Sequence, residues 1–109
     1  MMGENVEIHR ETTASDERVV WFRTDDAGGF VIHGQDLGAD HEYEWAHSYT
    51  ADQEKAAAAA LGGSPSEDLQ SVILSQIAQG TLPHNLAEWL EAHDITGAVW
   101  SRMEGNPFG

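Results

Sequence analysis

Histidine and carboxylate residues crowd one stretch of the sequence, where they could in principle hold a metal ion. His33, His41 and His47 are interspersed there with four acids, namely Asp36, Asp40, Glu42 and Glu44. Imidazole and carboxylate groups are ligands of zinc and manganese. Their spacing, however, fits neither the His-Glu-x-x-His motif nor an EF-hand loop. Because the alternation places His41 and His47 on the same strand face as Tyr43 and Trp45, we expect packing roles, with no metal and no cofactor.

Residues suited to catalysis have simpler interpretations. A carboxylate acid–base pair needs one desolvated group, but Asp25 and Asp26 fall in a predicted turn, where Asp caps local backbone. The pair Glu42 and Glu44 falls on the polar face of a predicted strand. Cysteine is absent and no Gly-x-Ser-x-Gly motif or phosphate-binding glycine loop occurs. We therefore predict no catalytic residues and a protein that is not an enzyme.

Overall charge restricts the partners. The 109 residues include 19 acids and 5 bases, for a net charge of −14. Such a surface repels nucleic acid and anionic membranes and favours cationic partners. The longest apolar run, residues 56–61, is much shorter than the roughly 20 residues of a membrane span, and the N-terminus shows no signal-peptide pattern. We expect a cytoplasmic protein with one domain, residues 1–109.

The elements that must position these residues divide into two halves. Strand signals come first, at residues 6–9 (weakly), 18–23, 30–33 and 42–49. Helix signals follow, because the pairs Thr50/Gln53, Ser64/Glu67 and Asn85/Glu88 each form a capping pattern. Pro65 suits the first turn of the second helix, and Gly62 and Gly80 suit helix ends. Residues 98–103 predict a returning strand, and residues 104–109 predict a disordered tail.

Strands grouped before helices predict an α+β fold. We expect an antiparallel sheet of about four strands with three helices on one face, in the order βββαααβ.

The strand at 18–23 is apolar on both faces, which raises the question of what covers the second face. One interpretation is that the N-terminal segment or a loop covers it. The other is a homodimer in which Val20 and Phe22 form the contact between two sheets.

Acidic residues dominate the helical half. From residue 40 to residue 94 the only base is Lys55. Some of the acids there are favoured simply by helix dipoles. The functional alternative is recognition of a basic protein, with Glu67, Asp68, Glu88 and Glu91 as contact residues.

Several short stretches resemble a known set of sequences. They are residues 34–38, 43–45, 61–63 and 100–102. In this order they resemble a family of small, acidic, uncharacterised actinobacterial proteins. The resemblance implies a bacterial cytoplasmic protein with a shared fold, and it transfers no catalytic residue. Its size and acidity suggest, by analogy, an inhibitor or an immunity partner of a toxin.

Three functions therefore stay open. The first is a non-enzymatic acidic domain that binds a basic protein. The second is a small-molecule-binding protein or minor enzyme, whose pocket between sheet and helices would be lined by His33, Tyr43, Trp45, His47 and Arg102. The third is a structural homodimer.

Overall fold

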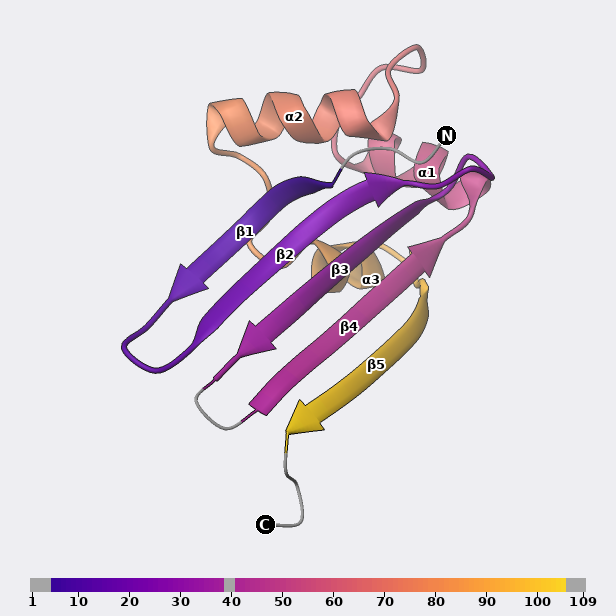
Figure 1. Ribbon diagram of the computed structural model, residues 1–109. Coiled ribbons are helices and arrows are strands. Elements are labelled where there is room, and N and C mark those ends of the chain that lie inside the picture. The colour runs from indigo at the N-terminus through magenta and orange to yellow at the C-terminus, as the bar shows by residue number, and fades with distance from the viewer. Residues whose placement is uncertain (1–4, 39–40, 106–109) are drawn as a thin grey trace.

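Five antiparallel strands form one sheet in the order β1-β2-β3-β4-β5 (Figure 1). The computed structural model describes residues 5–38 and 41–105. The strands are β1 (Val6–Thr12), β2 (Glu17–Thr24), β3 (Phe30–Leu37), β4 (His41–Tyr49) and β5 (Ala98–Gly105). The α+β class is confirmed, but the expected strand count and the order βββαααβ are wrong. The weak signal near the N-terminus is a full strand, so the order is ββββαααβ.

Three helices lie between β4 and β5, namely α1 (Ala51–Ala60), α2 (Leu69–Gln79) and α3 (Leu86–Ala92). Helix α1 begins at the predicted capping box, in which Thr50 and Gln53 satisfy each other's backbone N–H groups. The Gln53 side chain also donates to the Thr96 carbonyl oxygen at 2.9 Å, which ties α1 to the segment before β5. Helix α3 begins as predicted at Asn85, whose side chain accepts from the Glu88 N–H.

The start of α2 differs from the prediction. The N-cap is Asp68, whose carboxylate accepts from the Ser71 N–H at 2.8 Å. Ser64 and Glu67 do interact, because the Ser64 N–H donates to the Glu67 carboxylate, but the four residues form a turn and not a helical start. Helix α2 ends as predicted at Gly80, which adopts a left-handed conformation with φ of 72°.

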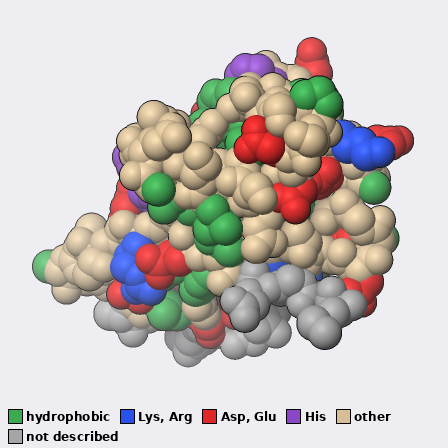
Figure 2. Space-filling view, turned by 90° about the horizontal axis from the view of Figure 1, so that it is seen from above, with side chains coloured by type: hydrophobic (Ala, Val, Ile, Leu, Met, Phe, Trp, Pro, Cys, Tyr) green, Lys and Arg blue, Asp and Glu red, His purple; other side chains and the backbone are tan. Residues whose placement is uncertain are grey.

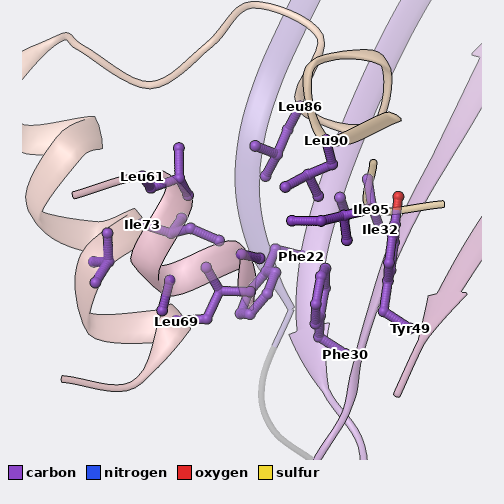
Figure 3. Packing of buried hydrophobic residues seen from close by; sticks show 13 residues of the cluster. Phe22, Phe30, Ile32, Tyr49, Leu61, Leu69, Ile73, Leu86, Leu90 and Ile95 are labelled. Atoms are coloured by element: carbon purple, nitrogen blue, oxygen red, sulfur yellow. The ribbon is translucent and has the colours of Figure 1, made fainter. Parts of the chain in front are cut away.

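One hydrophobic core joins the sheet to all three helices (Figure 3). Phe22 and Ile32 are cross-strand partners, so they share a face of the sheet, here called the helix-facing surface. Leu69 and Ile73 of α2 and Leu90 of α3 pack against it, and all five side chains are almost completely buried. Each such side chain contributes roughly 1.5–3 kcal/mol through the hydrophobic effect.

The C-terminal strand is longer than predicted. Strand β5 pairs with β4 from Ser48↔Ala98 to His41↔Gly105. Residues 104 and 105, which were predicted to begin a disordered tail, therefore belong to the strand, and residues 106–109 lie outside the described chain. Among the described helices, none combines the length and the apolar character needed to cross a membrane.

Candidate binding cleft

A cleft of about 1020 Å³ lies between α3 and the part of the helix-facing surface that the core leaves open. Strands β1 to β4 supply one wall, and α3 with the two residues before it supplies the other. The polar and aromatic residues that line it are His9, Glu11, Arg18, Tyr43, Trp45, His47, His84, Asn85, Glu88 and Glu91. The cleft therefore combines aromatic rings with several titratable groups.

Aromatic side chains form the floor of the cleft on β4. Tyr43 and Trp45 are stacked, with ring centroids 5.7 Å apart. The Trp45 ring lies directly over Gly34, its cross-strand partner, and a Cβ atom at Gly34 would come within 2.2 Å of Trp45 Cζ2. Because no other residue lacks a Cβ, the glycine is what allows the indole to lie flat on the sheet.

Arg18 lies across the floor of the cleft, and a carboxylate of the neighbouring strand balances its charge. Arg18 Nε and Nη2 donate to the two carboxylate oxygens of Asp36 at 3.1 and 2.9 Å. The Arg18 guanidinium carbon lies 5.2 Å from the centroid of the Trp45 ring, which is within cation–π range. The hydrogen bond to Asp36 raises the pKa of Arg18 above its usual value. Arg18 thus holds the indole in place and adds little net charge to the cleft.

Carboxylates dominate the opposite wall. Glu88 and Glu91 are exposed on α3 and line the cleft. Burial is the main cause that raises the pKa of Tyr49 to about 12, and the negative charge of Glu91 adds to it. Burial lowers the pKa of His47, and here Glu91 acts in the opposite sense. The negative potential of Glu91 therefore extends from α3 across to β4.

Histidines stand at the rim. The His9 and His84 rings meet edge to face with centroids 4.8 Å apart, and His9 Nε2 lies 3.1 Å from a Glu11 carboxylate oxygen. Despite these neighbours, the described residues contain no group of three or more histidines, aspartates or glutamates placed to hold a metal ion.

The expected pocket residues divide between the two faces of the sheet. Tyr43, Trp45 and His47 line the cleft together, but His33 does not. It pairs with Ala46 and lies on the other side of the sheet, the outer face. There it stacks on Trp21 with ring centroids 5.2 Å apart, and burial followed by the charge of Arg23 lowers its pKa.

The fifth expected pocket residue, Arg102, lies in β5, where its backbone pairs with Glu44. Its side chain, like that of His41, lies outside the described part of the chain.

The four acids proposed as partner contacts are also separated. Glu88 and Glu91 line the cleft, whereas Asp68 caps α2 and Glu67 accepts from the Ser64 N–H at 3.0 Å. The hydrogen bonds from Ser71 lower the pKa of Asp68. These two carboxylates have local structural roles, as does Asp25, which accepts from the backbone N–H groups of Ala27 and Gly29 at 2.9 Å each.

The residues expected to form a homodimer contact lie on the face of the sheet that the helices cover. Phe22 is fully buried in the core, and Val20 packs against that core. Because Val20 and Phe22 lie on the helix-facing surface, they cannot meet a second sheet while the helices are in place. The apolar residues of β2 on the outer face are Val19 and Trp21 instead.

Two parts of the cleft were not predicted. Arg18 and Asp36 form an ion pair between two neighbouring strands. In the sequence, this pair could have been suspected only from the opposite charges of two residues in adjacent strands. His9 and His84 come from distant parts of the sequence, so no local pattern could have joined them.

The comparisons with known proteins find no counterpart: no family model, no curated protein and no solved structure matches this chain. The resemblance to actinobacterial proteins therefore stays a prediction, and the cleft itself is the feature from which a function can be inferred.

Proposed function

We propose that the protein is a non-enzymatic, acidic interaction domain whose cleft binds a basic segment of another protein. The observation that carries the proposal is the charge of the cleft. Glu11, Glu88 and Glu91 line it, while Arg18, the one arginine among its described lining residues, is matched by Asp36. A cationic side chain entering the cleft meets the carboxylates of Glu88 and Glu91, for which the described residues supply no ion-pair partner, although Glu88 accepts a hydrogen bond from the neutral Asn85 amide at 3.2 Å.

The aromatic floor supports the same class of ligand. An arginine or lysine side chain gains from lying over an aromatic ring, by about 0.5–2 kcal/mol depending on its desolvation. Tyr43 and Trp45 are half-buried and stacked, and Trp45 already holds one arginine, Arg18, within cation–π range, so the floor is ordered and its chemistry suits a guanidinium group. Aromatic residues also dominate the binding energy of protein interfaces.

The wider surface would assist association. The chain has a net charge of −14, and Figure 2 shows carboxylate side chains spread over the end of the molecule near α1 and α2. Such a field attracts basic partners over long distances and raises their association rate. In this proposal the general surface charge steers the partner, and the cleft selects it. An inhibitory or immunity-like role would follow if the basic segment belonged to a toxin.

A defined peptide tests this proposal. The probe is a short peptide of alternating arginine and glycine, and the matched peptide has glutamine in place of arginine. The chain has four tryptophans, each with one indole N–H signal in a nitrogen–proton NMR spectrum. We expect the arginine peptide to shift the Trp45 signal at low salt and to leave the Trp100 signal, which belongs to the outer face, unchanged.

Charge-matched variants separate the cleft from general attraction. Glu88→Gln/Glu91→Gln and the control Asp52→Asn/Glu67→Gln remove the same charge, but only the first pair lines the cleft. We expect the cleft variant to weaken binding by about 2- to 30-fold, on the basis of about 0.2–1 kcal/mol for each of two exposed ion pairs. Equal weakening by both variants, or equal shifts of all tryptophan signals, would refute the proposal.

A further inference from the structure

The two edges of the sheet differ in how well they are protected against pairing with another strand. At the β1 edge the pairing register shifts between Glu7 and His9, which marks a bulge. Bulges and charged side chains are the usual means by which proteins block sheet edges. At the other edge, β5 pairs with β4 in eight consecutive steps without any shift. Strand β5 is therefore a regular edge strand.

Along the edge of β5 that faces away from β4, the described sheet has no neighbouring strand (Figure 1). A regular edge of this length presents a row of backbone N–H and C=O groups that can pair with another chain. Two large hydrophobic residues are exposed on the same strand: Val99 is 66% exposed and Trp100 is 52% exposed. As consecutive strand residues they lie on opposite faces of the sheet, so a paired strand would cover both.

Charge indicates which chain can approach this edge. Residues 98–105 contain one arginine and one glutamate, so β5 is neutral in a chain of net charge −14. A second copy of the same acidic chain is repelled from the helical side but meets no excess negative charge along β5. Antiparallel pairing of one strand with its own copy also satisfies the two-fold symmetry of a closed dimer.

We propose that β5 pairs antiparallel with β5 of a second copy, so that two five-stranded sheets join into one continuous sheet. In this dimer Val99 lies at the junction on the helix-facing surface, and Trp100 lies at the junction on the outer face. The cleft, which is lined by β1 to β4 and α3, stays open in each copy.

Light scattering with size-exclusion chromatography measures the first consequence. We expect a mass approaching twice 11.9 kDa as the concentration rises toward the millimolar range. Because both copies are strongly acidic, added salt should strengthen the dimer by screening their repulsion. A mass of one chain at all concentrations and salt levels overturns the proposal.

Two variants and a control locate the interface. Val99→Lys and Trp100→Lys each replace an exposed apolar side chain at the junction with a charge, which disfavours pairing at a sheet edge, and we expect each to weaken dimerisation by about tenfold or more. Leu74→Lys on α2 is the matched control, because Leu74 is also exposed, at 46%. Circular dichroism verifies that each variant folds. A dimer that both β5 variants leave intact, or that Leu74→Lys weakens equally, refutes the assignment.

Hydrogen exchange distinguishes edge pairing from packing of the outer faces. In an edge-paired dimer the outward N–H groups of β5 become protected as the concentration rises, because they bond to the second copy. Packing of outer faces would leave these groups exchanging rapidly at every concentration. Protection of β5 that depends on concentration supports the proposal, and rapid exchange in a proven dimer overturns it.

Discussion

Replacing Gly34 by alanine tests how the cleft floor is built. The added Cβ would lie 2.2 Å from Trp45 Cζ2 and 2.6 Å from Cε2 and Cη2. Carbon atoms in contact prefer separations of about 3.5–4.0 Å, so the indole must move by more than about 1 Å. Gly34 is buried within β3, between two paired strands, so the ring moves more readily than the backbone.

The displaced indole loses two interactions. Stacking on Tyr43 is worth about 0.5–1.5 kcal/mol, and the contact with Arg18 is worth about 0.5–1 kcal/mol. Alanine restricts the unfolded chain and thereby returns about 0.4–1 kcal/mol. We therefore expect Gly34→Ala to lower the free energy of unfolding by up to about 2 kcal/mol and to lower Tm by roughly 4–8 °C for each kcal/mol.

A double-mutant cycle with Trp45→Ala, measured by urea denaturation, isolates the contact. Without the indole the clash disappears, so Gly34→Ala should become neutral or slightly stabilising in the Trp45→Ala background. The expected coupling free energy between the two positions is about 1–2.5 kcal/mol. Gly34→Ala should also abolish the peptide-induced shift of the Trp45 signal. The same destabilisation by Gly34→Ala in both backgrounds would refute the reasoning.

Two further predictions concern pH. The lowered pKa of Asp68 means that its cap stabilises the fold above about pH 4 and loses this effect as the pH falls through the folded-state pKa. Asp68→Asn, which keeps a capping oxygen, should make acid denaturation less steep. Asp68→Ala should lower the free energy of unfolding by about 1 kcal/mol at neutral pH. Burial lowers the pKa values of His33 and His47, so the unfolded chain binds protons more readily and stability should fall as the pH drops below about 6.5. Thermal melts of a His33→Gln/His47→Gln variant should show a smaller loss between neutral and mildly acidic pH, and an unchanged loss would contradict this assignment.

Local signals in the sequence were sufficient for most of the elements. The Thr50 and Asn85 caps were readable because a cap depends only on residues within one turn. The start of α2 was not, because the predicted Ser64 cap forms only a turn and the actual cap, Asp68, lies four residues later. The decisive feature is tertiary: Leu69 is fully buried, and its N–H donates to the Glu54 carboxylate of α1 at 2.7 Å.

Which residues line the cleft depends on the pairing register between neighbouring strands, and the alternation of residues within one strand does not determine that register. Alternation correctly grouped Tyr43, Trp45 and His47. Whether His33 joined them depended on the pairing across the hairpin, where Ile32 and not His33 lies opposite His47. A shift of one residue in that pairing would exchange the faces of the whole strand. The sequence therefore predicted the β4 contribution to the cleft and misplaced the β3 contribution.

The pairing of β4 with β5 also determines how this molecule assembles. The first four strands are joined by short hairpins, whereas the partners Ser48 and Ala98 are separated in the sequence by the three helices. Contacts between distant residues form late in folding, because closing a long loop is entropically unfavourable. We therefore expect β5 to be the last strand to join the sheet and the first to detach from it, and the hydrogen bond from Gln53 to Thr96 holds only the segment before the strand. Stretching the molecule by its ends, or supplying a competing strand, should therefore release β5 before any other part of the sheet opens.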